Sequence, residues 1–591
     1  MKKYIIPVTI MFLTCFACED DFLNLDPLDS VTEAAYFNTP QQFENASNRL
    51  YGQLVGWSPS RASGLAESYN SNIFDFMSFG SDLRGLPLAE GRGANLIQND
   101  DKYWTNTYYY LRDVNILLEK SEEYGGDSVD ISKDVATAYF FRAWHHFFLL
   151  QRFGGVPIVT SVIDIDSPEL YGPRNSRYEV FGQIIEDLNK AIEGLPIEQN
   201  ISAADKGKIS KWAAEAFKAK VLLYEATWEK YVGTTTDFAG SGAPIGSVST
   251  YLTDAISLSK NVIENGGYQL WDYNNQLNNL SSYFLFNLED AESNTAGLDK
   301  TTNKEFIIQG IYDFDLRKGG TNISHTVAER LSPDRKMMDM VLCTDGLPID
   351  KSQLFQGYNK TSDEFKNRDY RLTAYFGENI PVDGSVVLPG TAGGSTSGSG
   401  IMARKFRSYK YGTYRAANEE SFNYPFLRLA EVYLIYAEAL VERDGSISDA
   451  DLNLSINKVR ARAGVAPLTN ALVSTKDLDM LEEIRRERAV ELYAENNRYN
   501  DLKRWGIAEQ ELNQDILGAV IEGTEYENNT SLYDPTDYVW GEKTIETAVG
   551  MRRVVVIDPA SNRNFTRKNY LFPIPPTQIN LNPALKQNPE W

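Results

Sequence analysis

Few residues of this sequence combine the types and the spacing that catalysis requires. The chain contains three histidines, His145, His146 and His325. The first two are adjacent in an apolar helical stretch, so they point in different directions and cannot form the i, i+4 pair of a zinc protease. The sequence has no P-loop, no pair of CxxC motifs and no G-x-S-x-G motif. We therefore predict no catalytic residue, no metal site and no cofactor.

A glycoside hydrolase needs only two carboxylates for catalysis, and acidic residues are abundant in this chain. The chain has 81 Asp and Glu residues. Those in the clearest helical motifs mostly have arginines within helical reach, so structural ion pairs explain them better than catalysis. They are Glu431, Glu438, Glu487, Glu491 and Asp501. A surface glycoside hydrolase stays one alternative function.

Residue types that bind sugars are plentiful in the irregular parts of the chain. Aromatic residues make up 12% of the sequence and include 34 tyrosines. Aromatic faces pack on sugar rings, and Asp, Asn and Arg bond vicinal hydroxyls. Alternatively, each aromatic fills the core of a long loop, as we expect for the helical Tyr108, Trp144 and Trp212. The predicted ligand contacts are Trp57, Tyr69, Asp82, Arg84, Trp271, Tyr273, Tyr283, Tyr312 and Tyr411.

The elements that must position these residues are predicted to be mainly helices. Apolar residues recur at three-and-four spacing in several segments that loops separate. The first has a strong start signal, with Thr39 as the capping hydroxyl, Pro40 in the first turn and Gln42 at the capping-box position. The predicted helices cover residues 39–54, 103–120, 133–152, 178–195, 211–230 and 251–265, and residues 305–311 have a strand-like apolar pattern.

The stretch from Tyr424 to Gly506 organises the rest of the chain. Its first part has the apolar spacing of a buried helix that starts near Tyr424, with Pro425 in the first turn and an Arg428–Glu431 pair on one face. Its second part carries a ladder of charges beside apolar residues, and we expect some of these charges to be buried and paired. The ladder consists of Glu487, Arg488, Glu491, Glu495 and Arg498.

Two strings in this region, FLRLAEVYLIYAEAL and IRRERAVELYAENNRYNDLKRWG, and the closing YLFPIPPTQINLNPALKQNPEW of the chain resemble the SusD/RagB family of outer-membrane nutrient-binding lipoproteins. The resemblance recurs at VTEAAYFNTPQQFENASNRLYGQL, AYFFRAWHHFFLLQRFGGVPIVT and GKISKWAAEAFKAKVLLYEATWEKY. It implies a mainly α fold, with a scaffold of four tetratricopeptide-like helical repeats and a long irregular second lobe. The predicted divisions are a signal peptide at 1–17, an N-terminal region at 18–231, the irregular lobe at 232–421 and a C-terminal region at 422–591.

The first residues read as a lipoprotein signal. Two lysines precede a short apolar core, and the small Ala17 stands before Cys18, the predicted lipidation residue. The acidic residues that follow Cys18 resemble the tag that sends such lipoproteins to the outer face of the outer membrane. We therefore expect a lipid-anchored protein that faces the cell exterior.

Net charge and resemblance together define the expected function. The formal net charge of −23 excludes nucleic acid as a partner and favours neutral ligands over anionic ones. The resemblance implies capture of an oligosaccharide and its delivery to a SusC-like TonB-dependent transporter. A peptide-capturing, RagB-like lid is the alternative. The glycan, its linkage and its length stay open, and residues 384–400 are predicted to form a flexible loop.

Overall fold

The computed structural model describes most of the chain. The predictions for the signal peptide at 1–17 and for Cys18, Tyr69 and Tyr411 lie outside the described residues, and so does the predicted loop at 384–400 except for Ser385 and Val386. The described residues are 36–54, 56–57, 77, 80–320, 322–377, 381–382, 385–386, 401–410, 412, 414–524, 527 and 540–591.

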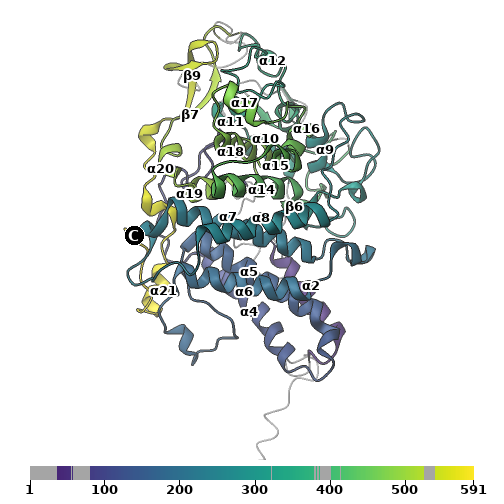
Figure 1. Cartoon of the computed structure of the whole chain (residues 1–591), viewed down its shortest axis with the longest axis vertical. Helices are drawn as coiled ribbons and strands as arrows, with labels where there is room; N and C mark the ends of the chain where they lie inside the picture. Colours follow the sequence, from purple (N-terminus) through teal and green to yellow (C-terminus); the bar gives the residue numbers. More distant parts are fainter. Residues whose placement is uncertain are drawn as a thin grey trace, which may run out of the picture.

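A stack of helices forms the scaffold, and these helices lie across the long axis of the molecule (Figure 1). Along the chain, α4 packs on α5, α5 on α6, α6 on α7 and α7 on α8; α8 then packs on α14, and α14 on α18. This confirms the predicted mainly helical fold. The helices are α2 (Pro40–Leu50), α4 (Lys102–Glu122), α5 (Ser132–Phe153), α6 (Arg177–Gly194), α7 (Lys211–Tyr231), α8 (Val248–Asn265), α14 (Leu429–Asp444) and α18 (Met480–Glu491).

Shorter elements complete the upper part and one side of the molecule in Figure 1. The short helices are α9 (Ser281–Phe284), α10 (Ile323–Arg330), α11 (Arg335–Met340), α12 (Thr361–Glu364), α13 (Tyr370–Tyr375), α15 (Asp449–Leu454), α16 (Ile456–Arg462), α17 (Asn470–Thr475), α19 (Arg498–Arg504), α20 (Ala508–Glu511) and α21 (Pro576–Leu581). The two-residue strands are β2 (Phe376–Gly377), β3 (Pro381–Val382), β4 (Ser385–Val386) and β5 (Met402–Ala403).

The predicted start of α2 is confirmed, and α6 begins with a capping box that was not among the predictions. Helix α2 begins at Pro40, and the backbone N–H of Thr39 donates to Oε1 of Gln42 at 3.0 Å. Helix α6 has a complete capping box, in which the Ser176 N–H donates to Glu179 at 2.7 Å and the Glu179 N–H donates back to the Ser176 hydroxyl at 3.2 Å. These bonds satisfy N–H groups that a helix start leaves without partners.

The start of the central helix differs from the prediction. Residues Tyr424–Arg428 form strand β6, which pairs antiparallel with β1 (Phe306–Gly310), and α14 begins only at Leu429. The predicted helix start at Tyr424 is therefore wrong, because pairing with a distant strand outweighs the local helical pattern. A second sheet joins β7 (Ile516–Val520), β9 (Gly550–Asp558) and β8 (Trp540–Thr547) in the order β7-β9-β8.

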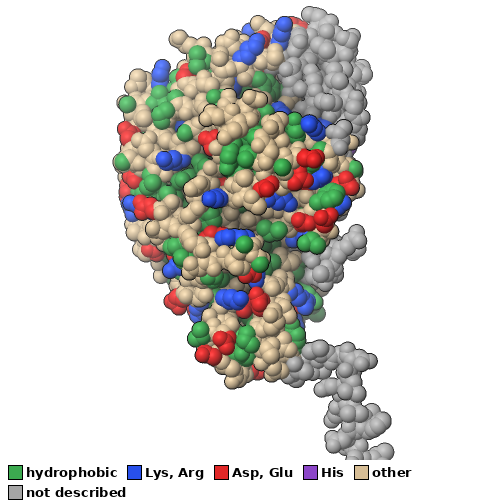
Figure 2. Space-filling view, turned by 90° about the vertical axis from the view of Figure 1, so that its right-hand side faces the viewer, with side chains coloured by type: hydrophobic (Ala, Val, Ile, Leu, Met, Phe, Trp, Pro, Cys, Tyr) green, Lys and Arg blue, Asp and Glu red, His purple; other side chains and the backbone are tan. Residues whose placement is uncertain are grey.

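Two large hydrophobic cores hold the molecule together. The first lies between the stacked helices. The second gathers aromatic residues from the irregular segments, including Trp57, Trp271 and Tyr312. Figure 2 shows acidic and basic side chains interspersed over the face that it displays. Within the described part of the chain, no helix is long and apolar enough to cross a membrane.

The prediction that some charges of the ladder are buried and paired is confirmed, since Glu487, Arg488 and Glu491 are buried and ion-paired. Glu491 accepts from Arg371 at 2.7 Å, from Arg428 at 2.6 Å and also from Arg462, and all four side chains are buried. The predicted Arg428–Glu431 pair is wrong. Arg428 instead bonds Glu305, Glu491 and Glu495, because its position on β6 turns it toward β1 and the end of α18.

Candidate functional site

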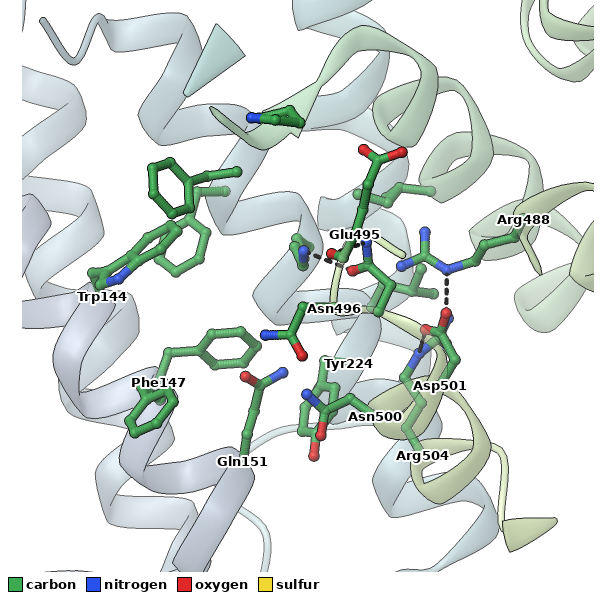
Figure 3. Close-up of a pocket in the computed structure, with 18 of the residues that line it drawn as sticks. Trp144, Phe147, Gln151, Tyr224, Arg488, Glu495, Asn496, Asn500, Asp501 and Arg504 are labelled. Atoms are coloured by element: carbon green, nitrogen blue, oxygen red, sulfur yellow. Dashed lines mark hydrogen bonds and ion pairs between the residues drawn. The ribbon is translucent and has the colours of Figure 1, made fainter. Parts of the chain in front are cut away.

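A cleft opens where the N-terminal helices meet the C-terminal part of the chain (Figure 3). We call it the amide cleft. Its walls are α5, α7, strand β6, the turn at 492–497 and α19, and it encloses about 1,090 Å³, including space open to solvent. Its polar and charged lining includes Gln53, His145, Gln151, Lys220, Arg488, Asn496, Asn497, Asn500 and Asp501, and its aromatic lining includes Trp144, Phe147, Phe148, Phe217, Tyr224 and Phe426.

Three amide side chains converge in this cleft. Gln151 comes from α5, Asn500 from α19 and Asn496 from the turn before it, and Figure 3 shows them reaching into the same space. All three are partly exposed, and within the described part of the chain none of their side-chain amides has a hydrogen-bond partner. Each amide offers two donors and a carbonyl acceptor, which is the chemistry that hydroxyl-rich ligands need.

Aromatic rings line the side of the cleft that α5 forms, next to Gln151 and across from Asn496 and Asn500. The half-buried Trp144 lies 4.8 Å from Phe217 and 6.0 Å from Phe426 between ring centroids. These two neighbours hold the indole in place, so it offers a rigid apolar surface beside the amides. The prediction that Trp144 is a core residue is half right: it packs on the first core and also lines the cleft.

The turn that carries Asn496 has an unusual backbone. Ala494 and Asn496 both have φ of +58°, in the left-handed region that non-glycine residues rarely adopt. The N–H of Asn496 donates to the carbonyl oxygen of Met77 at 2.8 Å, and Glu495 between them is ion-paired with Arg428 and Lys405. Surrounding contacts therefore hold a conformation that costs about 1–3 kcal/mol per residue.

Ion pairs form the floor of the cleft. Asp501 accepts from Arg488 at 2.8 Å and from Arg504 at 2.9 Å, and Lys220 donates to the Asn497 side chain at 2.9 Å. Burial alone would raise the pKa of Asp501, but the guanidinium groups of Arg488 and Arg504 hold it below its usual range. These charges are satisfied by one another, which suits a binding surface better than acid–base catalysis.

The adjacent histidines are packed, as predicted. His145 Nε2 lies 2.8 Å from Oε1 of Gln53, and His146 Nδ1 lies 3.0 Å from the carbonyl oxygen of Arg142. Burial lowers the pKa of both imidazoles to about 3, so both are neutral at pH 7. Among the residues that the structure describes, no group of three His, Cys, Asp or Glu side chains could hold a metal ion.

The neutral His145 predicts a pH-dependent contribution to stability. Its folded pKa of about 3 lies below the unfolded value of 6.5, so the unfolded state takes up the proton first and stability falls as the pH falls below 6.5. Between pH 7 and pH 5 the free energy of unfolding of the wild type, relative to His145→Gln, should fall by about 2 kcal/mol.

Urea titrations of both proteins at each pH measure this difference. The two proteins must be compared at each pH because both contain Asp334, whose pKa burial raises to about 7. Protonation of Asp334 increases the free energy of unfolding as the pH falls, and this effect cancels in the comparison. A difference that does not change between pH 7 and pH 5 would contradict a neutral, buried His145.

The structure brings few of the sequence-predicted ligand residues to a surface. The Trp57 indole N–H donates to the Phe422 carbonyl at 3.0 Å, and the Tyr283 hydroxyl donates to the Arg407 carbonyl at 3.0 Å. Trp271, Tyr312 and Arg84 are also buried, whereas Tyr273 is half-buried.

Asp82 is buried too, and it accepts two bonds from Arg498 at 2.7 and 2.9 Å. Hydrogen bonds inside the protein do not test whether these side chains contact a ligand. Their role as ligand contacts therefore stays a prediction. The structure separates them from the amide cleft, since none of them lines it.

Sequence reasoning missed the residues that line the amide cleft. One signal was present: the run Glu495–Asn500 places three asparagines directly after a ladder of paired charges. Asparagine adopts the left-handed region more readily than most residues, so such a run predicts a tight turn with exposed amides. Nothing in the run indicates that Gln151, far away in sequence, lies opposite.

Family models and relatives of known proteins match most of this chain. Residues 284–591 match the model of a family described as the SusD family, and residues 36–223 match one described as "Starch-binding associating with outer membrane". The chain is 24% identical over 528 residues to a SusD-like protein of Bacteroides ovatus, covering 85% of this chain and 83% of that relative. It is 22% identical over 533 residues to the SusD-like protein P25 of Formosa agariphila, covering 85% and 90%.

Solved structures share the fold. A SusD-like carbohydrate-binding protein of Bacteroides fragilis aligns with a TM-score of 0.67 at 22% identity, over 93% of this chain and 99% of that one. A laminarin-binding SusD-like protein aligns with a TM-score of 0.54 at 20% identity, over 94% and 100%. At these identities the likeness establishes a common, mainly helical fold.

Proposed function

Since this chain belongs to the SusD family, whose members are non-catalytic binding proteins, we propose that it captures an oligosaccharide in the amide cleft without changing it chemically. The observation that carries the proposal is the convergence of Gln151, Asn496 and Asn500, whose amides have no partner among the described residues. Amides that face open space are ready to bond sugar hydroxyls, because little desolvation has to be offset.

The aromatic wall supports the same ligand class. A sugar ring has one face of C–H groups, which packs on an indole or phenyl ring, and an edge of hydroxyls, which needs donors and acceptors. Trp144 and Gln151 both come from α5, and Asn496 and Asn500 lie across the cleft from this helix, so one sugar ring can contact the indole and the amides together. The relatives that are named for binding carbohydrate, laminarin or starch support this ligand class by analogy.

We further propose that the protein is lipid-anchored through Cys18 at the outer membrane and passes its ligand to a SusC-like TonB-dependent transporter. The signal-like N-terminus and the description of the family that residues 36–223 match support the membrane location. The transporter partnership rests on the family resemblance. Two acyl chains or more would anchor the protein stably, since each buried methylene contributes about 0.8 kcal/mol.

Affinity gel electrophoresis against a panel of polysaccharides tests capture. We expect at least one glycan to retard the purified protein, with no new reducing ends released. The double variant Gln151→Ala/Asn500→Ala should lose most of this retardation. The variant Gln41→Ala/Asn45→Ala, which removes the same two residue types from an exposed face of α2, should retain it.

Each of the other outcomes has a definite meaning. Undiminished retardation of the cleft variant would place the binding site elsewhere. Capture of peptides, with no glycan bound, would favour the RagB-like alternative, and release of reducing ends would favour a hydrolase.

A further inference from the structure

A second, smaller hollow continues from the amide cleft. It shares Phe148, Gln151, Asn496 and Asn500 with the cleft and encloses about 460 Å³, including space open to solvent. We call it the lysine hollow. The residues that it adds are Tyr103, Arg152, Tyr499, Lys503 and Phe572.

Lys503 is the unusual member of this lining. Its side chain is 1% exposed, and its ammonium group donates to the carbonyl oxygens of Gln151 and Tyr570, both at 3.2 Å. It also lies 4.6 Å from the centroid of the Tyr499 ring. Among the described residues, no carboxylate comes within ion-pair distance of this ammonium.

A buried ammonium without a counter-charge is costly. Carbonyl dipoles and a ring face solvate it only in part, and the uncharged form becomes easier to reach. Burial lowers the pKa of Lys503 well below its ordinary value, and the guanidinium groups of Arg152 and Arg177 lower it further. An anion in the hollow would relieve this cost.

The neighbouring Arg152 is a second cation in the lining of the hollow. The Arg152 guanidinium lies between two rings, 4.0 Å from the centroid of Tyr103 and 3.7 Å from that of Phe572. Asp101 accepts from it at 3.0 Å. Arg152 therefore has a carboxylate partner and Glu90 acts electrostatically on the nearby Tyr499, whereas the Lys503 ammonium has only carbonyl oxygens as hydrogen-bond partners among the described residues.

We infer that the lysine hollow is a subsite for an anionic sugar residue, whose carboxylate or sulfate is received by Lys503 while its ring packs beside Tyr103 and Phe148. Gln151 and Asn500, which line both spaces, would bond the hydroxyls of the same oligosaccharide. This inference rests on the proposed function and names the ligand class more closely. It departs from the expectation of a neutral ligand, because a local positive site outweighs a net charge of −23 at short range.

Calorimetry of the purified protein with matched oligosaccharides tests the subsite. One pair is an oligogalacturonate and its methyl ester; the other is a sulfated galactan oligosaccharide and its desulfated form. We expect the anionic member of one pair to bind about tenfold more tightly, as a charge-assisted bond would give, and the difference should shrink as salt rises. The pair that shows the difference distinguishes carboxylate from sulfate.

Variants of the lysine provide the second arm. Lys503→Met should remove the preference for the anionic ligand and change binding of the neutral one less than about twofold, whereas Lys503→Arg should retain the preference. Lys586→Met is the matched control, since the Lys586 ammonium also donates to a backbone carbonyl, that of Ala239 at 2.8 Å, and lies outside the hollow.

Equal binding within both pairs, or tighter binding of the neutral members, would overturn the subsite and leave glycan capture standing. Failure of every glycan, charged or neutral, would overturn both. The matched ligands are compared on the unaltered protein, so this conclusion does not depend on whether Lys503→Met folds.

Discussion

Replacing Glu491 by glutamine should lower the free energy of unfolding by about 3–5 kcal/mol, because it leaves three buried guanidinium groups without their shared carboxylate. Glu491 is fully buried and bonds Arg371, Arg428 and Arg462. Burial alone would raise the pKa of Glu491, but these three arginines hold it well below its usual range, so the group is ionised at neutral pH. Urea denaturation followed by circular dichroism measures the effect.

The matched control is Glu186→Gln on the surface of α6. Glu186 pairs with Lys190 at 2.7 Å, but their side chains are 58% and 40% exposed, so water and salt screen the pair. Its loss should cost less than about 0.5 kcal/mol. If Glu491→Gln cost no more than this control, the buried network would not need its central carboxylate.

Replacing Trp144 by alanine should weaken glycan binding by about tenfold or more, since a ring that is packed in place and half-exposed loses little entropy on binding. Trp144 is held against Phe217 and Phe426 and faces Asn496 and Asn500 across the cleft, with Gln151 on its own helix. Calorimetry with the glycan that the polysaccharide panel identifies measures the loss. Circular dichroism spectra should be unchanged, because the indole is only partly buried.

Trp212→Ala serves as the control for this experiment. Trp212 is also half-buried on a helix of the first half, but its indole N–H donates to Gln199 at 3.0 Å and it does not line the cleft. We expect its affinity to stay within about twofold of wild type. Equal affinity of the Trp144 and Trp212 variants would rule out Trp144 as part of the glycan site.

The two predictions are physically connected. Arg428 bonds Glu491 in the core and Glu495 in the turn, and Glu495 lies between Ala494 and Asn496, the two residues with a left-handed backbone. The buried charges therefore hold the turn that presents Asn496 to the cleft. A network of this kind contributes less to net stability than to a single defined geometry, which is what a preformed binding surface needs.

The sequence by itself determined where most of the long helices lie, where α2 begins and that some of the charges are buried and paired. Apolar spacing and capping residues such as Thr39, Ser176 and Glu179 act within one turn of helix, so their effect is written in consecutive residues. The motifs from Phe426 to Gly506 also carried enough of the pattern to indicate the family. These features depend on neighbours in the chain and little else.

Only the tertiary structure decided which predicted helix start became a strand, which acid each arginine met and which aromatic residues line the amide cleft. Tyr424–Arg428 became a strand because residues more than a hundred positions earlier offered backbone partners. Gln151 and Asn496 share a cleft because the C-terminal end of α5 lies beside α19, whose Lys503 donates to the Gln151 carbonyl. Burial and contact between distant segments set these outcomes, and local spacing carries no information about either.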